Sequence, residues 1–138
     1  MSSKEHPIVV KENNRQFVVI VPQKCDADKV QVDTADFETG VKRCDYAIRV
    51  TPTHKQFFYY VELKGNDILK AAKQLVSTVE MRKSDYAGYL QKEAWVISGG
   101  WCYAVNTQFQ KYRRIIKKFG FELQHMTRTH TISLIGKV

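Results

Sequence analysis

The chain has 138 residues, 43% of them hydrophobic, which is enough to bury the core of a globular domain and argues against disorder. Its 22 basic and 14 acidic residues leave a formal net charge of +8, which suits a polyanionic partner. The longest apolar run, Phe17 to Val21, is far too short to cross a membrane, and the opening MSSKEHPIVV lacks the apolar segment of a signal peptide. We therefore expect a single domain over residues 1–138 and a cytoplasmic location.

Metal-binding patterns of cysteine and histidine are missing from the sequence. The odd number of cysteines and the lack of CxxC spacing argue against a disulfide framework and a zinc site. Free thiols in a reducing compartment are expected instead. The four histidines show no ligand spacing and are expected to be structural or exposed. The tripeptide at 98–100 (SGG) is too short for a phosphate-binding loop.

The first elements in chain order are two strands at residues 7–12 (PIVVKE) and 16–21 (QFVVIV). The two asparagines between them suit a tight hairpin turn. Residues 23–43 are rich in Asp, Thr, Lys and Gly, which predicts a loop with one short strand at 30–32.

Two further strands are predicted at residues 45–51 (DYAIRVT) and 57–64 (FFYYVELK). The first alternates, which places Tyr46, Ile48 and Val50 on one face. The short turn between the two segments favours antiparallel pairing.

The second half of the chain predicts alternating helices and strands. Residues 66–83 predict a helix with Asn66 as its N-cap and the apolar face Ile68, Ala71, Ala72, Leu75, Val76 and Val79. A strand at 93–98 precedes a helix at 107–119, whose C-cap is Gly120. The inward residues of that helix are expected to be Phe109, Tyr112, Ile115, Ile116 and Phe119. Segments 121–126 and 129–136 then predict two closing strands. This order predicts an α/β (or α+β) fold with a mixed central β-sheet flanked by helices.

Charged residues occupy the end of an otherwise aromatic strand. Residues two apart in a strand share a face, so Tyr60, Glu62 and Lys64 should point one way. If the two strands pair antiparallel, Asp45 at the start of one lies beside Glu62 and Lys64 at the end of the other. Two carboxylates and a lysine would then converge at one edge of the sheet. The alternative is a surface ion pair between Glu62 and Lys64.

Such a cluster suits hydrolysis of a phosphodiester. Mg²⁺ or Mn²⁺ takes oxygen ligands, here the carboxylates of Asp45 and Glu62 and the carbonyl of Leu63. The metal polarises the phosphate and lowers the pKa of a bound water. Lys64 could position that water or stabilise charge in the transition state.

The residues CDYAIRV and YVELKGNDILKAAKQL resemble the PD-(D/E)xK nuclease superfamily, over roughly residues 44–80 and more loosely to 98. The resemblance implies a restriction-endonuclease-like core of order α-β-β-β-α-β, like that of Holliday-junction resolvases. It implies that Asp45 and Glu62 bind metal, that Lys64 is catalytic, and that Gln74 lies near the active site. It also implies an endonuclease that acts on DNA and forms homodimers.

Two departures from the family pattern are present. Cys44 stands where the family usually has Pro before the Asp. No helix is predicted before Asp45, although the family often draws an additional Glu from one. Glu38, Asp36 and Glu12 are candidates for that acid.

The second predicted helix carries five basic residues that could lie along a phosphate backbone: Lys111, Arg113, Arg114, Lys117 and Lys118. A solvated helix face is the alternative. For the whole chain, the alternatives to a nuclease are a non-catalytic nucleic-acid-binding or interaction module on the same fold, and an unrelated α+β domain.

Overall fold

The computed structural model describes residues 5–12, 14–23, 25–32, 46–51, 56–63, 68–99 and 107–135. The strands are β1 (Glu5–Glu12), β2 (Arg15–Pro22), β3 (Asp26–Gln31), β4 (Tyr46–Thr51), β5 (Phe57–Glu62), β6 (Gln91–Ser98), β7 (Phe121–Thr127) and β8 (Thr129–Ser133). The helices are α1 (Ile68–Met81) and α2 (Thr107–Lys117), with a 3-10 turn η1 (Lys83–Asp85) after α1. The order of strands and helices is the predicted one.

The larger sheet has five strands in the order β3-β4-β5-β6-β7. Its first three strands form an antiparallel meander, whereas β5, β6 and β7 run parallel. Helices α1 and α2 connect these parallel strands, as parallel pairing requires. The predicted mixed central sheet is therefore confirmed.

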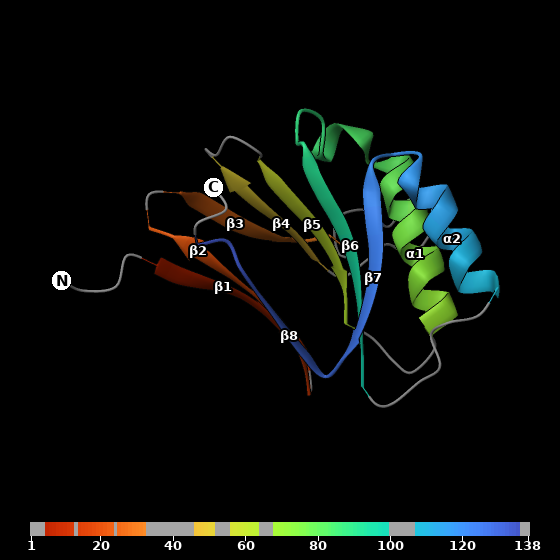
Figure 1. Ribbon diagram of the computed structural model, residues 1–138, viewed down its shortest axis with the longest axis horizontal. Helices are drawn as coiled ribbons and strands as arrows, with labels where there is room; N and C mark the ends of the chain where they lie inside the picture. The colour runs from red at the N-terminus through yellow and green to blue at the C-terminus, as the bar shows by residue number, and fades with distance from the viewer. Residues whose placement is uncertain are drawn as a thin grey trace.

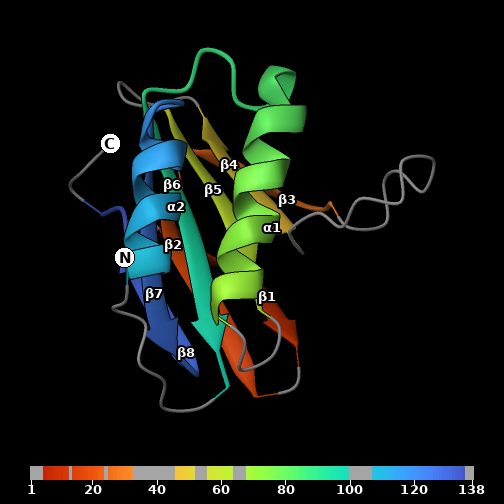
Figure 2. The same cartoon turned by 90° about the vertical axis from the view of Figure 1, so that its right-hand side faces the viewer.

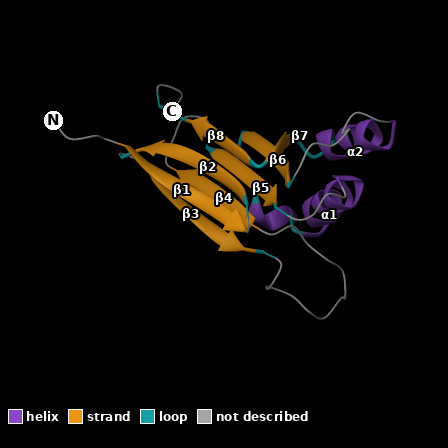
Figure 3. Ribbon diagram, turned by 90° about the horizontal axis from the view of Figure 1, so that it is seen from below, coloured by secondary structure: helices purple, strands orange, loops and turns teal. Residues whose placement is uncertain are grey.

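A second sheet, in the order β1-β2-β8, completes the fold. β1 and β2 form the predicted hairpin, in which Glu12 pairs with Arg15, and β8 runs parallel to β2. Figure 1 shows three layers: this smaller sheet, the five-stranded sheet and the two helices. Figures 2 and 3 show both helices on the same side of the strands. In the described part of the chain, helices thus cover one face of the central sheet and strands cover the other.

Each face of the central sheet has its own core. Helices α1 and α2 pack on β5, β6 and β7. All residues of the predicted apolar face of α1 are buried. Between the two sheets, Phe17 packs against Tyr59 and Trp95, with ring centroids 5.9 and 5.5 Å apart. Because both faces of β5 are covered, its segment FFYYVE is buried along its whole length, which explains the near-continuous apolar run.

The boundaries differ from the prediction mainly at β3. This strand spans Asp26–Gln31 and thus begins earlier than the predicted short strand at 30–32. Its sequence DADKVQ is polar and mostly exposed, because β3 lies at the edge of the sheet. At the other end, Gly120 has φ of +88° and donates its N–H to Lys117 O at 2.9 Å, which confirms the predicted cap of α2. Asn13 and Asn66 lie outside the described residues.

Candidate active site at the carboxyl edge of the central sheet

The parallel strands β5, β6 and β7 end at a common edge of the sheet, with Glu62, Ser98 and Thr127 as their last residues. In open α/β sheets this carboxyl edge is where ligands usually bind, because the connections to the helices leave side chains and backbone groups available there. Helix α1 follows β5 directly in the chain. This edge of the central sheet is therefore the candidate active site.

Glu62 is the last residue of β5 and is 0% exposed. Tyr60 packs in the core beneath the helices, whereas Tyr59, Val61 and Leu63 pack in the core between the sheets. Alternation therefore directs Glu62 toward the helices, on the face predicted for it. A carboxylate is expensive to remove from water unless its charge is compensated. The burial of Glu62 therefore requires a partner for its charge in the folded chain.

The predicted pairing of the two site strands is confirmed. β4 and β5 are antiparallel, and Tyr46 is the register partner of Val61. Asp45 precedes Tyr46 in the chain and Lys64 follows Leu63, but both lie outside the described residues. The structure thus brings together the start of β4 and the end of β5, where Glu62 lies. The convergence of the three side chains stays a prediction.

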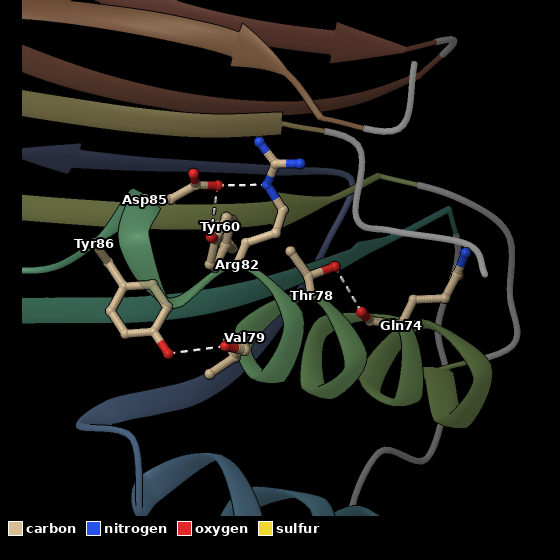
Figure 4. Close-up of polar contacts among 7 residues, drawn as sticks. All are labelled: Tyr60, Gln74, Thr78, Val79, Arg82, Asp85 and Tyr86. Carbon is tan, nitrogen blue, oxygen red and sulfur yellow. Dashed lines mark hydrogen bonds and ion pairs between the residues drawn. The ribbon is translucent and has the colours of Figure 1, made fainter. Parts of the chain in front are cut away.

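Gln74, the remaining predicted site residue, lies in the first half of α1. Its side chain is half-buried, and its main-chain oxygen accepts a hydrogen bond from Thr78 Oγ1 at 2.8 Å. Figure 4 shows the Gln74 amide extending away from this bond, at the end of α1 opposite Asp85. Asp85 instead accepts a hydrogen bond from Tyr60 Oη at 3.2 Å and pairs with Arg82. This second polar cluster ties the end of α1 to β5 and has no part in the candidate site.

A serine and a histidine that the sequence did not single out lie on the same face of this edge. Ser98 Oγ and His125 Nε2 are 3.0 Å apart, and Ser98 is buried. The register pairs Glu62 with Val96 and Val96 with His125, so roughly 10 Å separates the Cα atoms of Glu62 and His125. No short motif links these residues. Only the parallel pairing of β6 with β7 could have revealed them.

Among the candidates for an additional acid, Glu12 is described and ends β1. Its neighbour two residues back, Val10, is buried between the sheets, so the half-buried Glu12 faces the same side. Asp36 and Glu38 lie outside the described residues.

The basic residues of α2 divide into two groups. Lys111, Arg114 and Lys117 are exposed, and so is Lys118, which lies in the turn directly after α2. Arg113 is partly buried: its Nε donates to Leu123 O at 3.1 Å and its guanidinium stacks on Phe109. Arg113 therefore holds α2 against β7. The helix begins near the carboxyl edge and runs away from it, so Lys117 lies about 15 Å along the helix from Thr107.

Comparison with models of protein families, with curated proteins and with solved structures gives no match for this chain. No helix in the described ranges has the length and apolar character needed to cross a membrane.

Burial at this edge predicts a pH dependence of stability. Desolvation lowers the pKa of His125, and it also lowers that of His130, where the nearby Glu93 charge acts in the opposite direction. The unfolded chain then binds protons at a higher pH than the folded chain. The free energy of unfolding should therefore fall as the pH drops through the ordinary histidine value of about 6.5.

Urea unfolding at neutral and mildly acidic pH checks this expectation. His125→Gln and His130→Gln should each show a smaller loss of stability on acidification than the wild type. Equal losses in all three proteins would contradict it. The loss would then come from groups that all three proteins share, such as their carboxylates, and not from these histidines.

Proposed function

We propose that this protein is a metal-dependent nuclease of the PD-(D/E)xK type, which hydrolyses phosphodiester bonds of nucleic acid, in the first place DNA. The observation that carries the proposal is the fully buried Glu62 at the carboxyl end of β5. This carboxylate adjoins the start of β4, where Asp45 precedes Tyr46 in the chain. The segment that follows Glu62 supplies Lys64 and leads into α1.

The order of elements supports this assignment. β3, β4 and β5 form an antiparallel meander, α1 follows, and β6 returns parallel to β5. This is the β-β-β-α-β part of the core that the resemblance implies. In the described ranges no helix precedes this meander, and the sheet β1-β2-β8 covers the face opposite α1.

The residues at the carboxyl edge fit a hard divalent cation. Glu62 offers a carboxylate and Leu63 a main-chain carbonyl, and Asp45 would complete the set with a second carboxylate; all three donors are oxygen, as Mg²⁺ and Mn²⁺ prefer. Across the part of the chain that the structure describes, no group of three His, Cys, Asp or Glu residues lies close enough together to hold a metal by itself. When bound, the cation would polarise the phosphate and lower the pKa of a water molecule.

The chain's own side chains would then perform distinct tasks. Glu62 is fixed by the packing of β5 between two layers, so its carboxylate has little freedom to move. Lys64 would hold the attacking water or donate to the developing charge on the phosphate. Gln74, on the first half of α1, would support the site from the helix layer. The exposed basic residues of α2 would attract the polyanion.

A second candidate function is a binding module that keeps the nuclease fold without catalysis. The exposed basic residues Lys111, Arg114, Lys117 and Lys118 favour it, because they suit phosphate contacts whether or not the chain cuts. The two functions differ in their need for a metal. A binding module would hold nucleic acid equally well in a chelator and would tolerate loss of Lys64.

The test is cleavage of a mixed panel of supercoiled plasmid, single strands, branched junctions and RNA, with Mg²⁺, with Mn²⁺ and with a chelator. Metal-dependent cleavage is the expected result, and the substrate cut fastest would define the class. If no substrate is cut and binding persists in the chelator, the binding module is the better account.

Metal binding should also stabilise the folded chain. At about 100 times its dissociation constant, a cation that binds only the folded state raises the free energy of unfolding by about 2.7 kcal/mol. Chemical unfolding with Mn²⁺ or a chelator measures this gain. Glu62→Gln should lose most of it, whereas Glu80→Gln, at an exposed position of α1, should keep it. An equal gain in Glu62→Gln would place the cation elsewhere.

A further inference from the structure

A basic side chain from the smaller sheet packs on a glycine at the carboxyl edge. Arg15 is the first residue of β2, and Phe17, two residues on, is buried against the central sheet, so Arg15 faces that sheet too. A Cβ atom added to Gly99 would lie 2.7 Å from Arg15 Nη2 and 3.0 Å from Nε. Real side chains do not approach so closely. The guanidinium can therefore occupy this place only because residue 99 has no side chain.

The position of Arg15 is fixed by backbone contacts. Arg128, at φ of +63°, forms the corner between β7 and β8. Its N–H donates to Ser98 O at 2.8 Å, and its carbonyl accepts from the N–H of Gln16 at 2.7 Å. The end of β6 and the start of β2 are thus joined through one residue, which fixes the backbone from which the Arg15 side chain extends toward Gly99.

The polar partners of this guanidinium are incomplete. Arg15 Nε is buried and has no hydrogen-bond partner among the residues that the structure describes. Two other arginines differ: Arg49 pairs with Asp28 at 2.7 Å and Arg82 pairs with Asp85. A buried donor without an acceptor destabilises the folded chain. Because Nε is buried, an acceptor from outside the chain would have to meet the Nη groups of this half-buried side chain.

We propose that Arg15, seated on Gly99, binds one backbone phosphate of the nucleic-acid strand beside the cleavage site. The two Nη groups of a guanidinium present N–H donors side by side, which match two phosphate oxygens. The register pairs Glu62 with Val96, three residues before Gly99, which puts the Cα atoms of Glu62 and Gly99 roughly 11 Å apart. That is the axial length of about three nucleotides of one strand. The subsite rests on the proposed function for the identity of its anion.

The variants that test this subsite separate charge from position. Arg15→Met removes the charge. Gly99→Ala keeps the charge but adds a methyl group where the guanidinium lies, so Arg15 must move. The matched control is Lys92→Met at the opposite end of β6, because Lys92 packs on Gly120 in the same manner, with Cε 2.9 Å from a Cβ added there. All three variants should melt close to the wild-type temperature.

The measurement is fluorescence anisotropy of labelled single-stranded and duplex oligonucleotides, titrated in a chelator at several salt concentrations. Each phosphate contact contributes about 0.9 to the slope of log affinity against log salt for duplex DNA, and about 0.7 for single strands. Arg15→Met and Gly99→Ala should each lower the slope by about that amount and weaken duplex binding about eightfold near 0.1 M salt. Lys92→Met should leave the slope unchanged.

An unchanged slope in Arg15→Met, or a Gly99→Ala protein that binds like the wild type, would overturn the subsite. A slope lowered equally by Lys92→Met would do the same, because net charge alone would then explain the effect. Cleavage by the wild type is measured separately. If the wild type cuts nucleic acid but Arg15→Met binds it normally, the result supports the proposed nuclease and contradicts the phosphate subsite. If no nucleic acid is cut but Arg15→Met and Gly99→Ala both bind it weakly, the result supports the phosphate subsite and contradicts the proposed nuclease.

Discussion

Replacing Lys64 with alanine should reduce metal-dependent cleavage by about 10²–10³-fold and leave nucleic-acid affinity nearly unchanged. The proposed task of this ammonium is to hold the attacking water or to meet charge that grows on the phosphate only in the transition state. An interaction made only there lowers the rate constant and not the binding of the ground state. Single-turnover cleavage at saturating enzyme, with Mn²⁺, measures that rate constant directly.

Lys73→Ala is the matched control, because Lys73 is an exposed lysine in the first half of α1, the helix that follows Lys64 in the chain. It removes the same charge without touching the proposed chemistry and should cut at close to the wild-type rate. Glu62→Gln should lose activity as Lys64→Ala does, through loss of the metal. A Lys64→Ala enzyme that cuts at full rate would rule out this lysine as the catalytic group, whatever the fate of Glu62.

The sequence predicted well wherever local periodicity decides the structure. The apolar face of α1 repeats with the helical period, and each of its residues is buried. The run FFYYV predicts a core strand, and β5 is a strand whose six residues are all buried. The direction of Glu62 follows from the same alternation, because a strand with period two leaves it only one face to occupy.

The pairing of strands that are distant in the chain could not be predicted from the sequence. Nothing in THTIS indicates that β8 leaves the sheet of β7 and pairs in parallel with β2, since that choice depends on the corner at Arg128. The smaller sheet therefore covers the face of the central sheet opposite α1 and α2, and no sequence pattern indicated this arrangement. The predicted strand at 30–32 is shorter than β3, because an edge strand has few buried positions and so shows little alternation of apolar and polar residues.

The same division holds for the candidate site. The pattern of charged residues at the end of β5 could be found because it lies within one segment. Ser98 and His125, and likewise Arg15 and Gly99, come together only through pairing of distant strands. The five basic residues between positions 111 and 118 looked alike in sequence. Arg113 nevertheless faces β7 and Phe109, because its position around the helix axis, and not composition, decides its neighbours.

Phe121→Ala should lower the free energy of unfolding by about 3–5 kcal/mol, the usual loss for a fully buried phenylalanine. Phe121 is 0% exposed under the helices. Its ring stacks on Tyr60 at 5.6 Å and meets Tyr86 edge-on at 4.9 Å. Rigid rings around the resulting cavity can fill it only by leaving their favoured geometry, so little of the loss would be recovered.

Urea unfolding of three variants measures this effect. Phe121→Leu keeps most of the apolar volume and should lose clearly less than Phe121→Ala. Met126→Ala, on the same strand but 41% exposed, should change stability by about 0.5 kcal/mol or less. A small loss in Phe121→Ala would mean that the aromatic cluster repacks freely. Tyr60 belongs to this cluster and lies two residues before Glu62 on the same face, so a cluster that repacks could not hold that carboxylate in one place.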